Sequence, residues 1–306
     1  MITHIWIAAL IFLNQFIVPE HLEKHLEMVH KEKIIDRPTR SQFVLPVTGP
    51  PLVDNDRLNA YMDHLNSLVV SPAVNAKINA SGGITPGRSG HRLYRRMFKD
   101  QFYASFYSGG TQPVHVPLIA VQPKVDSELL GQIRVQAIGR YATFFNPGNK
   151  SRANNITLAL KAINNHVVFP GEIFSFNHVV GRRTKAKGYR TAKVIVRGEY
   201  SEGIGGGICQ VSSTLFNAAD RAGLHIVQRF SHSKHVSYVP PGRDATVSWY
   251  GPDFQFQNNY HQPILIRAHS SGSHLSFTLY SSDVINFKPK HVPAPAKKLP
   301  RQHEHR

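Results

Sequence analysis

Apolar residues in the first third of the chain recur with helical and then with alternating spacing. Capping candidates at Asp54 to Asp56 precede a helical run, which predicts an amphipathic helix through Leu68. Alternation from Val74 to Ala80 predicts a strand, and apolar residues 114–121 predict another. Aromatic residues at successive i, i+4 positions predict a second helix between them, and we interpret them as core rather than as a ligand site: Tyr94, Phe98, Phe102 and Phe106. Residues 49–128 are therefore expected to form a small α+β unit.

A second unit is expected over residues 129–283. It begins around residues 135–145. Buried strands are expected at 167–169 and 194–196, and helices from the cap Asn154 to Asn164 and from Gln210 to Ala222. After these come only strand signals, at 226–230, 245–250, 254–256 and in a predicted hairpin of 264–268 with 275–280 across Ser270-Ser271-Gly272. The predicted fold class is α+β, with strands dominating the second half of this domain.

Three further segments are expected to lie outside these units. Residues 1–19 begin with an apolar run of signal-peptide length and predict either an export signal or an N-terminal anchor, so we expect an exported protein of the cell envelope. A short buried helix is the alternative. Residues 20–48 are charged and His-rich and are predicted to be a linker, with a juxtamembrane helix as the alternative. Residues 284–306 are rich in Pro, Lys and His and are predicted to be a disordered basic tail.

Charge and cysteine content narrow the possible partners and chemistry. The 306 residues carry a formal charge of +17, so the partner is expected to be anionic: a nucleic acid, an acidic lipid or an acidic wall polymer. No zinc-finger spacing, RNP-type sequence or basic zipper occurs, so specific nucleic-acid binding has no support. The single cysteine excludes an internal disulfide, and a redox-sensing role is disfavoured because a second, resolving cysteine is missing.

The cysteine lies in the most informative segment of the chain. Glycines 205–207 allow positive φ and close approach of a substrate, and the helical pattern that follows places Cys209 near a helix N-terminus. Free amides and the helix dipole at that position favour a thiolate, and the same amides can stabilise an oxyanion. A phosphate-binding loop is excluded because no Gly-Lys-Ser/Thr follows. The alternative is that Cys209 is a small buried residue at a tight junction.

A nucleophilic thiolate needs a base and a group that orients the base. His232 and His235 follow a predicted strand after the cysteine helix, and Asp244 is the nearest acidic residue on the next segment. Either histidine could return beside Cys209. With 18 His in the chain, a chance proximity in sequence remains an equal alternative.

Many short motifs in this second unit resemble the VanW family. They are Asn146 to Arg152, Asn155-Ile156, Phe169 to Asn177, Val180 to Thr184, Gly188-Tyr189, Gly205 to Gln210, Arg229, His232-Ser233, Tyr238 to Pro240, Gly242, Asp244 to Val247 and Asp253-Phe254. The match spans roughly residues 130–270. The first unit resembles the peptidoglycan-binding module that often precedes this domain.

The resemblance implies a surface protein that acts on peptidoglycan, in a family first named from glycopeptide-resistance clusters. Some VanW-domain proteins are understood to be L,D-transpeptidases that use the motif cysteine. The resemblance implies that Cys209 is the nucleophile and that His232 is the base. Asp244 is the candidate orienting acid because of its place in the sequence. The loop and the candidate substrate-binding residues are Gly206, Gly207, Gln210, Arg182, Arg183, Tyr189 and Arg229.

This implied chemistry needs neither a cofactor nor a metal, and its partners are stem peptides and anionic wall polymers. No Ser-His-Gly precedes Cys209, which departs from the better-known L,D-transpeptidase signature. A carboxypeptidase, or a module that only binds the wall, therefore remains an alternative to the transpeptidase.

Overall fold

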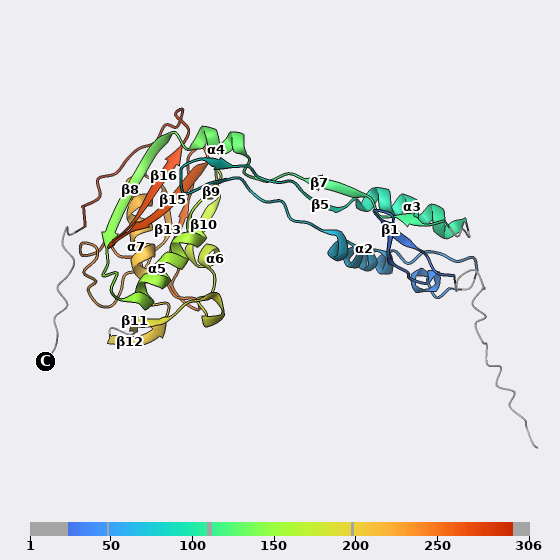
Figure 1. Cartoon of the computed structure of the whole chain (residues 1–306), viewed down its shortest axis with the longest axis horizontal. Helices are drawn as coiled ribbons and strands as arrows, with labels where there is room; N and C mark the ends of the chain where they lie inside the picture. Colours follow the sequence, from blue (N-terminus) through green and yellow to red (C-terminus); the bar gives the residue numbers. More distant parts are fainter. Residues whose placement is uncertain (1–23, 48, 109–111, 197–198, 296–306) are drawn as a thin grey trace, which may run out of the picture. The chain divides into compact units, whose positions relative to one another are not determined.

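The computed structural model describes residues 24–47, 49–108, 112–196 and 199–295 (Figure 1). The predicted leader, residues 1–19, lies outside these ranges. Each helix within them is too short or too polar to cross a membrane. The chain divides into two units: one holds the segments up to Val74 and from Arg88 to Pro123, and the other holds Asn75–Gly87 and everything from Lys124 onward.

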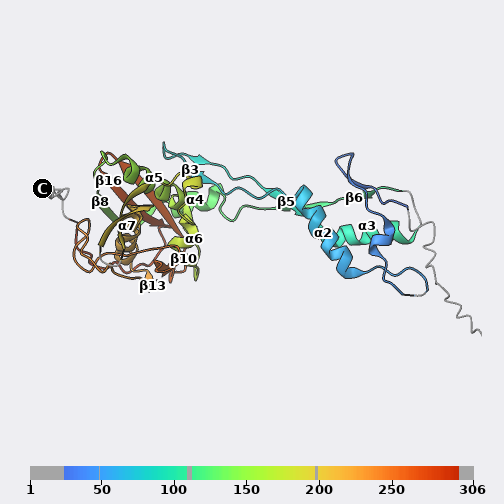
Figure 2. The ribbon, with the colours of Figure 1, turned by 90° about the horizontal axis from the view of Figure 1, so that it is seen from below.

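The first unit contains the two predicted helices, α2 (Asn55–Val69) and α3 (Arg95–Tyr107) (Figure 2). The carboxylate of Asp54 accepts hydrogen bonds from the amides of Asp56 and Arg57 at 3.0 and 3.1 Å, which caps α2. The aromatic stripe of α3 is buried in the core, as predicted, at Phe98, Phe102 and Phe106. Tyr94 is not part of that core: it precedes the helix and is exposed.

The segment expected to be a linker, 20–48, is folded where the structure describes it, so that prediction was wrong. It forms β1 (Met28–His30), β2 (Lys33–Asp36) and the 3-10 helix η1 (Arg40–Phe43). β1 pairs with β2 and, in parallel, with β6 (Val114–His115). Leu26, Met28 and Phe43 are buried against α2 and α3. The parallel strand partner comes from far along the chain, so the local pattern could not reveal it.

Two predicted strands are shorter than expected. The alternation at 74–80 yields only β3 (Lys77–Ile78), which pairs with β4 (Ile84–Thr85) in the second unit. The run 114–121 is divided between β6 and β7 (Leu118–Val121), and β7 pairs with β5 (Gly90–Leu93).

The second unit is built on an antiparallel sheet in the order β8-β16-β15-β9. Its strands are β8 (Gln136–Phe144), β9 (His166–Val168), β15 (Ile264–Ser271) and β16 (His274–Ser281). The predicted hairpin of β15 and β16 is confirmed. With its helices and small sheets the chain has the predicted α+β fold.

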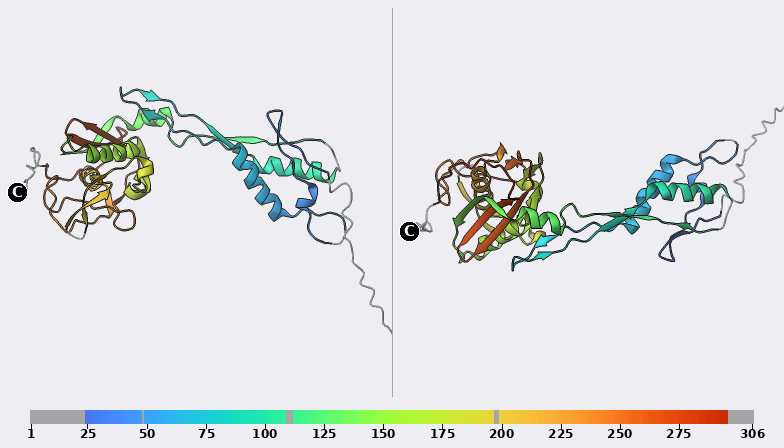
Figure 3. Two further views of the ribbon diagram at one scale, coloured as in Figure 1. Left: turned by 60° about the horizontal axis from the view of Figure 1, so that its bottom comes forward. Right: turned by 90° about the horizontal axis from the view of Figure 1, so that it is seen from above.

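Two helices, α5 (Lys150–Ile163) and α7 (Ile208–Arg221), cover one face of this sheet (Figure 3). α7 lies very close to β8 because Gly139 has no side chain: a Cβ there would lie 2.4 Å from the carbonyl oxygen of Ala218. The helix α4 (Ser127–Ile133) packs with β3 and β4 against residues of the opposite face, such as Val167 and Leu265. α5 begins earlier than predicted, because Asn149 rather than Asn154 caps it.

Smaller elements complete this unit. In a three-stranded sheet, β10 (Ile173–Ser175) pairs with β14 (Gln255–Gln257), and β14 pairs with β13 (His225–Gln228). The short helix α6 (Phe176–Val180) directly follows β10. β11 (Thr191–Val196) and β12 (Glu199–Ile204) form a hairpin. The predicted strand at 245–250 is wrong. Ala245 pairs with the hydroxyls of Ser212 and Ser213 on α7, and the Thr246 amide donates to the carbonyl oxygen of Phe230 at 2.8 Å without forming a strand ladder.

Part of the segment expected to be a disordered tail is ordered. Val292 is buried in the core, and the guanidinium of Arg221 donates to its carbonyl oxygen at 2.6 Å. The hydroxyl of Tyr141 donates to the carbonyl oxygen of Pro293 at 2.9 Å. Composition alone suggested disorder, but these partners belong to helix and sheet residues distant in sequence. Residues 296–306 lie outside the described ranges.

Candidate active site

Cys209 lies in the first turn of α7, directly after the hairpin of β11 and β12. Gly205 and Gly207 have φ values of 93° and 106°, a conformation that favours glycine. Gly206 is required for close packing, because a Cβ there would lie 2.6 Å from the carbonyl oxygen of Lys193. The predicted glycine loop is therefore a tight connection that delivers the cysteine to the helix N-terminus.

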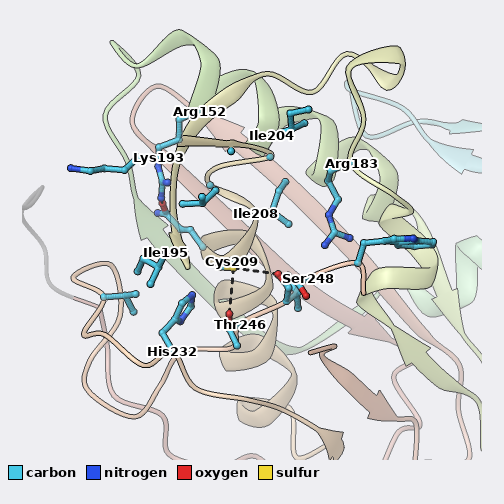
Figure 4. Close-up of a pocket in the computed structure, with 18 of the residues that line it drawn as sticks. Arg152, Arg183, Lys193, Ile195, Ile204, Ile208, Cys209, His232, Thr246 and Ser248 are labelled. Carbon is cyan, nitrogen blue, oxygen red and sulfur yellow. Dashed lines mark hydrogen bonds between the residues drawn. The ribbon is translucent and has the colours of Figure 1, made fainter. Parts of the chain in front are cut away.

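The thiol faces the segment 243–247. Its Sγ lies 3.7 Å from Oγ1 of Thr246 and 3.6 Å from the carbonyl oxygen of Val247 (Figure 4). Polar side chains of α7 hold this segment in place: Oγ of Ser213 accepts from the amide of Ala245 at 2.8 Å, and the Asn217 side-chain amide donates to the carbonyl oxygen of Arg243 at 2.8 Å. One helix thus positions both the cysteine and the chain opposite it.

His232 is the histidine beside Cys209. Both residues line the same pocket, and the imidazole points toward the sulfur in Figure 4. On its other side, Nδ1 of His232 lies 2.6 Å from Oδ2 of Asp244, which also accepts from the His232 amide at 2.6 Å. His235 is exposed instead. Of the two histidines left open by the sequence, the fold brings only His232 into line with Cys209 and Asp244.

The environment favours a thiolate-imidazolium pair. Burial raises the pKa of the Cys209 thiol, but the hydrogen bond to His232 and the charge of His232 outweigh it, so the thiol pKa is lowered. Burial lowers the pKa of His232, whereas hydrogen bonds to Asp244 and to Cys209 raise it more strongly, to about 9. The carboxyl pKa of Asp244 is also lowered, because its two hydrogen bonds with His232 outweigh burial. Near neutral pH the arrangement is therefore primed for nucleophilic attack.

A pocket of about 570 Å³ opens above this pair. Cys209 is partly exposed at its base. The walls come from β11, β12, the start of α7 and the segments 236–238 and 246–250. The nucleophile is therefore accessible to a ligand of moderate size.

The site lies within a part of the chain that is similar to known proteins. The model of a family described as "VanW like protein" matches residues 151–280, which include all three residues of the site. The chain is 52% identical over 298 residues to "Uncharacterized protein YoaR" of Bacillus subtilis (strain 168), covering 97% of both proteins. The chain belongs to the VanW family. It is also 31% identical over 115 residues to the "Vancomycin B-type resistance protein VanW" of Enterococcus faecalis (strain ATCC 700802 / V583), covering 36% of this chain and 42% of that protein. No solved structure matches it.

Within this VanW domain, the predicted substrate-binding residues divide into two groups. Arg182 and Arg183 line the pocket, and the Arg182 guanidinium lies 5.3 Å from the centre of the Tyr250 ring. Tyr189 is buried in the core outside the pocket lining. Arg229 also lies outside it and donates to the carbonyl oxygens of Asp244 and Gly242, at 2.7 and 2.8 Å. Tyr189 and Arg229 thus support the VanW site without lining its pocket.

The glycines and Gln210 shape the loop, and Gln210 also connects β8 to Arg152, which the sequence did not indicate. Gly206 and Gly207 are both buried, and Gly207 also lines the pocket. Gln210 is only 1% exposed; its Nε2 donates to Oγ1 of Thr143 and to the carbonyl oxygen of Phe144, at 3.1 and 2.8 Å. Its Oε1 accepts from the guanidinium of Arg152 at 2.7 Å. Only an edge of Gln210 can therefore reach a ligand.

Sequence reasoning missed several residues of the pocket, above all Arg152, Lys193, Tyr238 and Thr246. Arg152 and Thr246 lie within motifs that carry the family resemblance, which was a usable signal. Tyr238 also lies within such a motif, whereas Lys193 gave no signal of its own, because a lysine on a strand is ordinary. Among the described residues, no group of histidine, cysteine or acidic side chains is arranged to hold a metal ion.

Proposed function

We propose that this protein is a cysteine-dependent acyl transferase that acts on the stem peptides of peptidoglycan, in the manner of an L,D-transpeptidase. Membership of the VanW family suggests a role at the cell envelope. The observation that carries the proposal is the line of Cys209, His232 and Asp244 at the base of an open pocket. A nucleophile, a base and a group that orients the base are the components that acyl transfer requires.

The first half of the reaction is acylation. The Cys209 thiolate attacks the carbonyl carbon of the amide after the third residue of a stem tetrapeptide, and the carbonyl oxygen becomes an oxyanion. The Cys209 amide, for which the described residues provide no acceptor, is suited to donate to that oxyanion. The His232 imidazolium then protonates the leaving nitrogen, the C–N bond breaks, D-Ala departs, and a thioester remains on Sγ.

The second half returns the enzyme to its starting state. Neutral His232 accepts a proton from the side-chain amine of a neighbouring stem as that amine attacks the thioester. The C–S bond breaks, a new amide joins the two stems, and Sγ leaves as a thiolate beside the imidazolium. Water in place of the amine gives a free carboxylate, which makes the protein a carboxypeptidase.

The competing proposal is a wall-binding module without catalysis. The formal charge of +17 favours it, because such a charge attracts anionic wall polymers whether or not the cysteine reacts. In either case we propose that residues 1–19 direct or anchor the protein outside the membrane and that the first unit binds peptidoglycan. No nucleic acid is invoked.

Intact-mass measurement of the full chain with tetrapeptide muropeptides tests catalysis. We expect an adduct equal to the stem without D-Ala on the wild type and on His235→Gln, none on Cys209→Ala, and a strongly reduced amount on His232→Gln. His235 is the matched control, because it is exposed and close in sequence to His232. Absence of adduct and of released D-Ala from folded wild type would favour the binding module.

A further inference from the structure

The pocket above Cys209 is lined by cationic side chains without any acidic one among the described residues. Its cationic residues are Arg152, Arg182, Arg183, Lys193 and His232. Asp244 lies beneath His232 and does not line the pocket. A ligand with negative charge is therefore favoured here, and two of the arginines are held in fixed positions.

Arg152 is held on one side of the cysteine. Its guanidinium donates to Oε1 of Gln210 at 2.7 Å, and Gln210 is itself anchored to β8 by two hydrogen bonds. Burial lowers the pKa of Arg152, with opposing effects of Tyr238 and Cys209. The neutral amide fixes the guanidinium but does not compensate its charge.

Arg183 is held on the other side in the same way. Its guanidinium donates to Oδ1 of Asn177 at 2.8 Å, and the Asn177 side-chain nitrogen donates to the carbonyl oxygens of Ser248 and Pro252, at 2.9 and 3.1 Å. Burial lowers the pKa of Arg183, with opposing effects of Cys209, Tyr189 and Asp253. Asp253 forms no ion pair with it, because its oxygens accept from Ser175, Asn177, Phe254 and Gln255.

The two guanidinium groups lie on opposite sides of the sulfur (Figure 4). Both interact with its charge. Each is preorganised by a buried side-chain amide, an arrangement that leaves the forked donor surface of arginine available to a carboxylate. A ligand with a carboxylate at each end of the bond that Cys209 attacks would compensate both charges.

We propose that Arg152 and Arg183 form a pair of carboxylate-binding positions that select acyl donors with a free carboxylate on each side of the scissile amide. This rests on the proposed function. In a stem peptide, one carboxylate is the terminus of the leaving residue, and the other is carried by the side chain of the residue that donates the acyl group. Amidation of either carboxylate weakens binding, because a neutral amide leaves one arginine uncompensated.

Alkylation of Cys209 tests the two positions without peptidoglycan. The probes are iodoacetate and iodoacetamide: in both, the thiolate forms the new C–S bond and iodide leaves, but only the first carries a carboxylate. We expect the rate ratio of iodoacetate to iodoacetamide to exceed that of free cysteine by on the order of tenfold in the full chain. Arg152→Gln and Arg183→Gln should each lower this ratio severalfold, whereas Arg140→Gln, an exposed arginine on β8 outside the pocket, should not.

The ratio separates anion binding from changes of the thiol pKa, since both reagents need the same thiolate. Arg152→Lys keeps the charge and should retain part of the preference, which makes the result independent of whether Arg152→Gln disturbs Gln210. A ratio equal to that of free cysteine, or a ratio that the two arginine variants leave unchanged, would overturn the proposal.

Tetrapeptides amidated at one carboxylate or the other complete the test. We expect KM to rise about tenfold or more for each amidated form, with a smaller change of kcat. Equal KM values for free and amidated peptides would overturn the carboxylate pair but leave acyl transfer intact. Failure of every peptide to react, with the iodoacetate preference present, would instead overturn the proposed function and support the anion site.

Discussion

Nδ1 of His232 lies 2.6 Å from Oδ2 of Asp244, and the same oxygen accepts from the His232 backbone amide at 2.6 Å. Only 5% of the His232 side chain and 9% of the Asp244 side chain are exposed, so solvent screens this pair weakly. One carboxylate therefore fixes both the ring and the backbone of the residue beside Cys209, and it stabilises the imidazolium that keeps the cysteine ionised.

Replacement of Asp244 should change the reactivity of Cys209 indirectly, through His232. In Asp244→Asn the imidazolium loses its carboxylate, so the pKa of His232 falls and the pKa of Cys209 rises. We expect the rate of iodoacetamide alkylation near neutral pH to fall about tenfold or more. The exposed Asp283 provides the matched control Asp283→Asn. An unchanged alkylation profile in Asp244→Asn would contradict the role assigned to the carboxylate.

Acylation and alkylation should differ in their dependence on pH. The thiolate forms as pH rises through the lowered pKa of Cys209, so both rates increase there. Acylation also needs protonated His232 to supply a proton to the leaving nitrogen, so it should decline as pH rises through about 9. Alkylation by iodoacetamide needs no proton donor and should not decline. Parallel profiles measured on the same preparation would argue against His232 as the acid.

Gly206→Ala should destabilise the VanW domain, because the new Cβ would lie 2.6 Å from the carbonyl oxygen of Lys193 and force β11 away from the loop. We expect a loss of about 1–3 kcal/mol in the free energy of unfolding. Gly131→Ala is the matched control: Gly131 lies within α4 and has open space around its Cβ position, so a gain of about 0.5–1 kcal/mol is expected. Urea denaturation of both variants measures the difference. Similar stabilities for the two would refute the close approach.

Val292→Ala tests whether the segment after β16 belongs to the folded domain. Val292 is 3% exposed and Val284 is 73% exposed, so the two valines offer the same substitution in opposite environments. We expect Val292→Ala to cost about 1–3 kcal/mol of unfolding free energy and Val284→Ala to stay within about 0.5 kcal/mol. Thermal unfolding of both variants against the wild type is the measurement. An equal, small effect would mean that the segment does not pack as described.

The sequence by itself determined the elements in which the spacing of apolar side chains reflects which face is buried. The stripes on α2 and α3 and the hairpin of β15 and β16 were predicted because burial on one face imposes a period on the chain. Cys209 and its glycine loop were predicted for a similar reason: the conformational demands of a tight connection before a helix can be recognised locally.

Only the tertiary structure decided which partners meet across the chain. It chose His232 over His235, gave Arg229 and Tyr189 supporting places, and brought Arg152 from α5 to the pocket through Gln210 on α7. It also ordered segments with little apolar content, near β1 and Val292, whose partners lie far away in sequence. The physical reason is that periodicity records whether a residue is buried, whereas hydrogen bonds and charge interactions depend on which distant segments the packing brings together.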